Sequence, residues 1–119
     1  MPSLGMHGPY DLTVGKVEEI VKPYVPGVFA IGYTRESGAF VVQYIGRSDR
    51  DVRAELMAQP MDETTRFKWV EMPSQRVAFE TQCRLYHDFG ESRVLENENH
   101  PERPAGANWP CPVCDIYGR

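Results

Sequence analysis

The spacing of hydrophobic residues predicts a short helix followed by a β-hairpin in the first half of the chain. Valines and an isoleucine recur every three or four positions between residues 14 and 21, as on one face of a helix. Thr13 is a candidate N-cap, and Pro23 ends the pattern. Two apolar, β-branched runs follow at 26–34 and 39–46, and the polar, glycine-containing turn 35–38 between them predicts a hairpin.

The second half of the chain predicts two more helices and one more strand. In residues 48–59, Val52 and Leu56 face inward, either Ser48 or Asp49 is the N-cap, and Pro60 is the stop. Residues 65–72 alternate as a strand does, with two aromatic residues on one face. The clearest helix spans 74–89, from an N-cap at Ser74 to a stop at Gly90.

This order predicts an α+β fold with a small three-stranded antiparallel sheet flanked by helices. At 119 residues the chain is long enough for one domain, with residues 1–12 as an N-terminal arm and 91–119 as a proline-rich tail. No apolar run approaches the roughly 20 residues that span a bilayer, and the N-terminus does not resemble a secretion signal. We therefore expect a cytoplasmic protein without a membrane partner.

A tyrosine and three arginines gather where the second hairpin strand gives way to the next helix. Tyr44 closes the strand, and Arg47, Arg50 and Arg53 follow at intervals of three. Because helix N-termini attract anions, this group is a candidate phosphate site. The alternative is a solvated helix face with local ion pairs. The formal net charge of −4 argues against non-specific coating of nucleic acid but permits such a local site.

Glu80 is the second candidate for chemistry. It lies in the first two turns of the clearest helix and shares a face with Arg84 and His87. It is either one half of a surface ion pair or an inward carboxylate that could bind Mg²⁺ together with several waters.

Taken in order, these segments resemble the GIY-YIG nuclease superfamily. Tyr44-Ile45-Gly46 matches the second signature element, and Gly27-Val28-Phe29 matches the first, with phenylalanine where the family usually has tyrosine. An arginine-bearing helix, a third strand and a helix with a glutamate, here Glu80, follow in the family's order. Asn108 stands where an asparagine often closes the motif set. The resemblance covers about residues 26–108.

The resemblance implies a DNA endonuclease that hydrolyses phosphodiester bonds with one Mg²⁺ or Mn²⁺ ion. By this resemblance Glu80 holds the metal, Tyr44 helps to activate water, and an arginine stabilises the developing charge. Arg53 is the first candidate for that arginine, while Arg47 and Arg50 remain open and are otherwise candidate substrate contacts together with Asn108. This hypothesis requires Tyr44, the arginine and Glu80 to converge on one cleft.

The cysteines form a separate signal. Cys111 and Cys114 make a C-x-x-C pair in the tail, and His100 and His87 are the best candidates to complete a four-ligand zinc site. The alternative is two free cysteines in a tail turn. Three functions therefore stand: a GIY-YIG endonuclease, a catalytically weak or inactive relative that binds nucleic acid or protein, and a zinc-stapled interaction domain.

Overall fold

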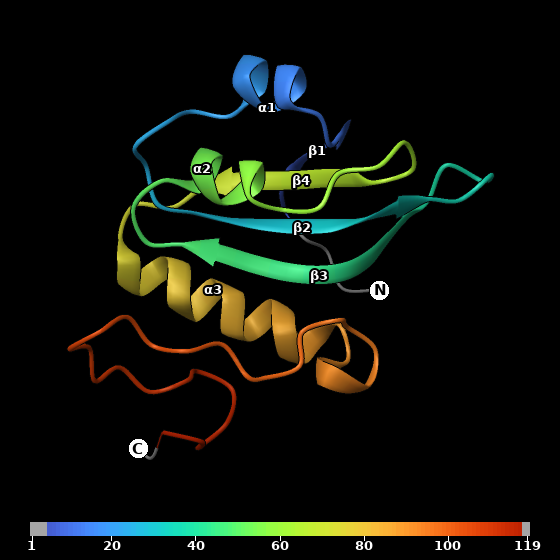
Figure 1. Ribbon diagram of the computed structural model, residues 1–119. Helices are drawn as coiled ribbons and strands as arrows, with labels where there is room; N and C mark the ends of the chain where they lie inside the picture. The colour runs from blue at the N-terminus through green and yellow to red at the C-terminus, as the bar shows by residue number, and fades with distance from the viewer. Residues whose placement is uncertain (1–4, 118–119) are drawn as a thin grey trace.

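A four-stranded antiparallel sheet is the centre of the molecule. The computed structural model describes residues 5–117 (Figure 1). In chain order its elements are β1 (His7–Asp11), α1 (Val14–Ile20), β2 (Gly27–Thr34), β3 (Phe40–Ser48), α2 (Val52–Met57), β4 (Arg66–Glu71), α3 (Gln75–Asp88) and the 3₁₀ turn η1 (Glu91–Arg93). This is the expected α+β class, with the expected hairpin, helices and third strand close to their predicted bounds.

The sheet has one strand more than the sequence pattern predicts. The strand order is β1-β4-β2-β3, and every neighbouring pair is antiparallel. The extra strand is β1, which lies in the segment expected to be an arm; residues 1–4 of that segment are outside the described residues. Its residues are mostly exposed, because β1 is an edge strand that pairs only with β4. The expected three-stranded sheet and the expected N-terminal arm were therefore wrong in this respect.

Helices α1 and α2 cover one face of the sheet (Figure 1). Alternate residues of β2 and β4, Phe29 with Ile31 and Phe67 with Trp69, point to this face. They pack with residues of the two helices and the segments beside them: Leu12, Val17, Val21, Val52 and Leu56. The partly buried Tyr44 of β3 belongs to the same cluster. This face therefore holds the larger part of the aromatic core.

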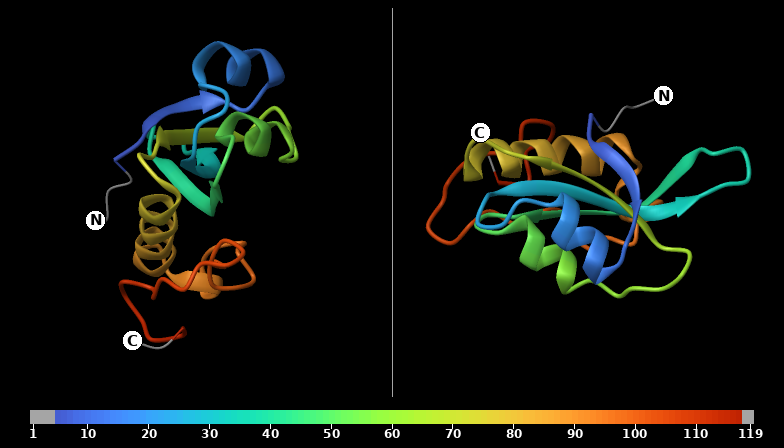
Figure 2. Two further views of the ribbon diagram at one scale, coloured as in Figure 1. Left: turned by 90° about the vertical axis from the view of Figure 1, so that its left-hand side faces the viewer. Right: turned by 90° about the horizontal axis from the view of Figure 1, so that it is seen from above.

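Helix α3 covers the opposite face, as the left-hand view of Figure 2 shows. The intervening residues of the strands, Val28, Ala30 and Ile45, pack there against Ala78 and Leu85 of α3. Ser74 caps the helix, as expected, by accepting a hydrogen bond from the Val77 N–H, and Gly90 follows its C-terminus with a φ of 102°.

The β3–α2 junction differs from the expected one. Strand β3 continues to Ser48, and Asp51 is the residue that caps α2, through a hydrogen bond from the Ala54 N–H. The expected cap was either Ser48 or Asp49. Ser48 instead accepts hydrogen bonds from the N–H groups of Arg50 and Asp51 and shapes the turn that leads to the cap.

The tail covers the outer edge of β3. The Glu96 N–H donates to the Gln43 carbonyl at 2.6 Å. The buried amide of Asn97 accepts from the Ile45 N–H at 2.9 Å and donates to the Ile45 carbonyl at 2.7 Å. At Gln43 and Ile45 these bonds replace those of a missing neighbour strand, and such cover hinders pairing of this part of the edge with another chain.

Candidate metal centre

Helix α3 and the tail together build a small second core. Cys83 and Phe79 lie on the side of α3 that faces the tail, and both are fully buried. The tail returns along the helix (Figure 1) and places the buried Cys111 against them, with Trp109 and Tyr117 packed around the group. His87 follows one helical turn after Cys83 and so points toward the same segment.

Four potential ligand atoms meet at this point. They come from His87, His100, Cys111 and Cys114, and all of them lie within 4.8 Å of one another. The two histidine Nε2 atoms are 3.2 Å apart, Cys111 Sγ is 3.6 Å from His87 Nε2, and Cys114 Sγ is 3.4 Å from His100 Nε2. A tetrahedral ion with Zn–N of about 2.05 Å and Zn–S of about 2.3 Å separates two nitrogens by about 3.3 Å and a nitrogen from a sulfur by about 3.6 Å. The observed spacings match that geometry.

Hydrogen bonds fix both imidazole rings for metal binding. Nδ1 of His87 lies 2.6 Å from the Glu91 carboxylate, and Nδ1 of His100 lies 2.9 Å from the Pro101 carbonyl oxygen. A carbonyl oxygen can only accept, so Nδ1 of His100 carries a proton; the carboxylate favours the same tautomer at His87. The two Nε2 lone pairs then face each other at 3.2 Å, an arrangement that a cation between them stabilises.

The surroundings favour the metal-binding form of Cys111. Burial opposes ionisation of its thiol, but hydrogen bonds from the backbone N–H groups of Cys114 and Val113 are the leading causes that lower its pKa to about 6. For Cys83, burial and the adjacent Cys111 raise the pKa strongly, so this third thiol stays protonated. Cys111 is therefore the thiolate of the pair at neutral pH, which is the form that binds metal.

Aromatic side chains close the centre. Tyr86 packs edge-on against both histidine rings, with ring centroids 5.3 and 5.5 Å away. Tyr117 packs edge-on against His100 and donates a hydrogen bond to the Pro101 carbonyl at 2.8 Å. Four protein ligands would fill a tetrahedral shell and leave no open coordination position, as in metal sites that hold structure rather than catalyse.

The residues expected to form a nuclease site are not gathered in the same way. Tyr44 is half-buried on the α1/α2 face of the sheet. Burial, and then the nearby Glu55 carboxylate, raise the pKa of Tyr44 above its ordinary value, so its phenol is protonated at neutral pH. Glu80 lies on α3, across the sheet, and about 200° around the helix from Ala78, which packs on the sheet. It pairs with Arg76 at 3.4 Å.

Two of the three arginines are engaged in holding the fold. Arg53 donates to the carbonyls of Val21 and Glu18, both at 2.7 Å, at the C-terminal end of α1. Arg47 is nearly buried and binds Asp49, Gln82 and the Glu102 carbonyl, with its guanidinium over the Phe79 ring at 5.4 Å. Arg50 is exposed in the turn before α2. The expected convergence of Tyr44, an arginine and Glu80 on one cleft is therefore absent from the described residues.

The signature segments have structural roles in the hairpin. Gly46 lies opposite Phe29, and a Cβ on Gly46 would come within 2.1 Å of the Phe29 ring. A Cβ on Gly27 would come within 2.9 Å of Val52 in α2. Both glycines thus allow close packing of buried neighbours.

The asparagine that contacts the Tyr-Ile-Gly strand is Asn97, whereas Asn108 is exposed in the tail. The sequence pattern did not identify Asn97 or Gln82, because each acts through a tertiary contact. It also missed Glu91, whose contact with His87 is local, at i,i+4 across the end of α3. The one sequence feature that could have pointed to Asn97 is its position between the helix stop at Gly90 and His100, a candidate metal ligand.

Comparison with protein-family models, curated proteins and solved structures finds no match for this chain. Within residues 5–117, the group of His, Cys, Asp and Glu residues that could hold a metal ion is the His87/His100/Cys111/Cys114 set, which does not include Glu80. No helix in the described part of the chain is long and apolar enough to cross a membrane.

Proposed function

We propose that this protein is a zinc-binding domain in which one Zn²⁺, held by His87, His100, Cys111 and Cys114, fastens the C-terminal tail to the sheet and to α3. The observation that carries the proposal is the convergence of four N and S atoms at tetrahedral spacing. Mg²⁺ and Mn²⁺ prefer oxygen ligands, so two thiolates and two imidazoles favour zinc.

The expected role of the ion is structural. Tail residues close to the ligands in sequence carry the Glu102 carbonyl, which binds Arg47, and the Trp109 and Tyr117 rings, which pack on Phe79. Asn97, between the ligands His87 and His100, covers part of the edge of β3. A tail without regular secondary structure has high conformational entropy when free, and four metal bonds offset that cost at one point.

Metal content and stability test this proposal directly. Protein purified without added zinc should contain close to one zinc per chain by elemental analysis, and Cys111→Ser or His100→Ala should remove most of it. Cys83→Ala is the matched control, because it deletes a neighbouring thiol that is outside the ligand set, and it should keep the zinc. Wild-type protein with less than one zinc per ten chains, and no rise in melting temperature when zinc is added, contradicts the proposal.

For the domain as a whole, the geometry supports the non-catalytic relative of the GIY-YIG nucleases better than an active endonuclease. The order of hairpin, helix, strand and helix, with Tyr44-Ile45-Gly46 on β3, favours the resemblance. The separation of Tyr44 and Glu80 by the sheet opposes a shared metal-bound water. We therefore propose a GIY-YIG-like binding module that lacks phosphodiester turnover through these residues.

A plasmid-nicking assay separates the two functions. Supercoiled plasmid is incubated with zinc-loaded protein and Mg²⁺ or Mn²⁺, in parallel with Glu80→Ala. The binding-module proposal expects equal, background nicking by both proteins. Metal-dependent nicking that disappears in Glu80→Ala would establish the endonuclease instead and would give Glu80 a catalytic role despite its distance from Tyr44.

A further inference from the structure

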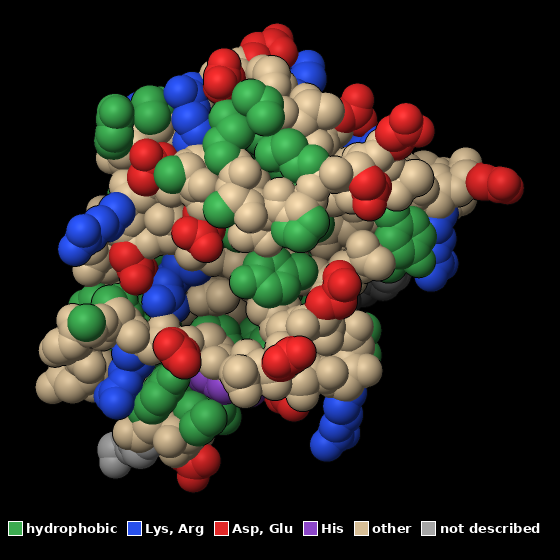
Figure 3. Space-filling model, viewed as in Figure 1, with side chains coloured by type: hydrophobic (Ala, Val, Ile, Leu, Met, Phe, Trp, Pro, Cys, Tyr) green, Lys and Arg blue, Asp and Glu red, His purple; other side chains and the backbone are tan. Residues whose placement is uncertain are grey.

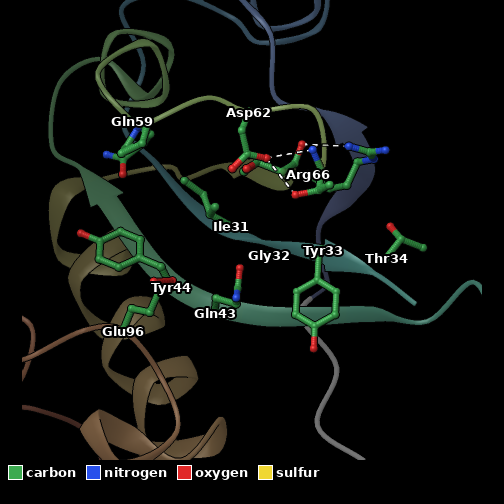
Figure 4. A pocket seen from close by; sticks show the side chains of 13 residues that line it. Ile31, Gly32, Tyr33, Thr34, Gln43, Tyr44, Gln59, Asp62, Arg66 and Glu96 are labelled. Carbon is green, nitrogen blue, oxygen red and sulfur yellow. Dashed lines mark hydrogen bonds between the residues drawn. The ribbon is translucent and has the colours of Figure 1, made fainter. Parts of the chain in front are cut away.

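A cleft of about 700 Å³ lies between the β2–β3 hairpin and the segment that joins α2 to β4, and none of the four candidate metal ligands lines it. Ile31 and Tyr44 of the hairpin line one side of the cleft, and Gln59 and Asp62 of the segment between α2 and β4 line the other side (Figure 4). A volume of this size is within the range of sites for small molecules or single side chains of a partner. The zinc proposal does not involve this cleft.

A β-bulge turns two neighbouring side chains toward the cleft. The pairing of β2 with β3 shifts from Ile31–Tyr44 to Gly32–Val42, which leaves Gln43 without a direct partner. Consecutive strand residues normally point to opposite faces of a sheet, yet both Gln43 and Tyr44 line this cleft. Bulges are found next to functional sites because they re-aim side chains in this way.

The charge that the cleft offers to a ligand is negative. The carboxylates of Asp62 and Glu96 line it from two sides. Arg66 is the cation among the lining residues, and it is engaged with the Asp11 carboxylate at 3.0 Å and with the Glu63 carbonyl at 2.9 Å. Figure 3 shows acidic side chains around the hydrophobic groups on this face. A phosphate group would meet repulsion here.

Two tyrosine rings add a second feature that favours a cationic ligand. Tyr44 and Tyr33 both line the cleft, and tyrosine rings attract cations that lie over them. A guanidinium is a planar cation that stacks on such rings and donates paired hydrogen bonds to a carboxylate. An ammonium could lie over a tyrosine ring, but it lacks the planar fork that donates paired hydrogen bonds to a carboxylate.

We propose that the cleft binds a guanidinium group, stacked against Tyr44 and hydrogen-bonded to the Asp62 carboxylate. Asp62 is fixed for this contact by its own loop, because its Oδ1 atom accepts hydrogen bonds from the N–H and the hydroxyl of Thr64, both at 2.8 Å. The guanidinium comes either from a small organic cation or from an arginine side chain of a peptide. Tyr44 is in this view a cation-binding ring.

An NMR titration of ¹⁵N-labelled, zinc-loaded protein tests the proposal. The probes are N-acetyl-arginine N-methylamide, its citrulline counterpart, which has the same shape without the charge, and agmatine. The arginine probe should shift the amides of Gly32, Gln43 and Thr64, with an affinity at least tenfold higher than that of the citrulline probe. Binding by agmatine with similar affinity would identify a free cation as the ligand class, and binding by the amide probe alone would identify a peptide arginine.

Matched variants locate the site. Asp62→Asn keeps an acceptor for Thr64 but removes the charge, and Tyr44→Leu removes the ring; each should weaken the arginine probe at least fivefold. Asp88→Asn makes the same change of charge at the exposed end of α3 and should leave the affinity unchanged. Equal binding of the citrulline and arginine probes, equal effects of Asp62→Asn and Asp88→Asn, or the absence of shifts at these amides would overturn the proposal.

Discussion

The two hydrogen bonds between Asn97 and Ile45 should be among the strongest single contributions of the tail to stability. Asn97→Ala removes both the 2.9 Å bond from the Ile45 N–H and the 2.7 Å bond to the Ile45 carbonyl. The carbonyl keeps a second donor, because Gln82 Nε2 lies 3.2 Å from it, but the N–H has no replacement on the buried edge of the strand. The substitution therefore leaves the Ile45 N–H without a hydrogen-bond acceptor and the Ile45 carbonyl with one donor instead of two.

The expected cost follows from these two losses. An orphaned buried donor costs about 1–3 kcal/mol, and a hydrogen bond that is lost while its acceptor stays satisfied costs about 0.5–1.5 kcal/mol. We expect Asn97→Ala to lower the free energy of unfolding by about 2–3 kcal/mol. For a domain of this length, 1 kcal/mol corresponds to roughly 4 °C, so the melting temperature should fall by roughly 8–12 °C.

Urea denaturation and thermal melting of zinc-loaded protein, followed by far-ultraviolet circular dichroism, measure this loss. Asn99→Ala is the matched control, since Asn99 is exposed two residues away, and it should change the free energy of unfolding by less than about 0.5 kcal/mol. Hydrogen exchange at the Ile45 amide should also accelerate in Asn97→Ala. If the two variants have the same stability, the tail does not protect the edge of β3 and the reasoning is refuted.

Three further predictions concern other parts of the molecule. Gly32→Ala should lower the free energy of unfolding by at least about 2 kcal/mol, because the added Cβ would lie 1.8 Å from the Val41 carbonyl oxygen. Gly15→Ala, in open space on α1, should instead raise the free energy of unfolding by up to about 1 kcal/mol. Urea denaturation of both variants measures these opposite changes. Arg47→Lys should cost about 2–4 kcal/mol in the same assay and make the tail easier to cleave with protease, because an ammonium cannot reach Asp49, Gln82 and the Glu102 carbonyl together; unchanged tail cleavage argues against this role. In metal-free protein the Cys111 thiolate should form as pH rises through about 6. A pH titration of thiolate absorbance detects this step, and Cys111→Ser should abolish it. Because this pKa lies below the ordinary value of 9.0, the stability that the ionised thiol contributes is present in full above pH 9 and is lost as pH falls through about 6.

The sequence pattern predicted the elements that follow a strong periodicity. Phe67 and Trp69 alternate on β4 as expected, and α3 begins and ends at its expected signals, Ser74 and Gly90. Strand β1 was missed because the segment His7–Asp11 contains Gly and Pro and lies mostly exposed at an edge, so it has no alternating hydrophobic pattern. The local pattern therefore predicted strands whose burial is one-sided and failed for an exposed edge strand in which Tyr10 is the partly buried residue.

The candidate site shows the same division. The C-x-x-C pair and the two histidines could be read from residue types, since a metal site is limited to few ligands. The separation of Tyr44 and Glu80 could not be predicted from residue types. It depends on which face of the sheet the chain crosses to after β4, and no single residue determines that crossing. The contact of Asn97 with β3 likewise depends on the path of the tail. Residue chemistry thus identified ligands but did not place them relative to the sheet.

The tail's cover over β3 has a consequence for the newly made chain. Ile45 and Asn97 are 52 residues apart, and the last metal ligand, Cys114, follows later still. At roughly 5–20 residues per second, β3 leaves the ribosome roughly 3 to 10 seconds before the segment that covers it. During that interval its N–H and C=O groups are open to strands of other nascent chains. Aggregation during synthesis, more than instability of the finished fold, is where loss of the tail should first be visible.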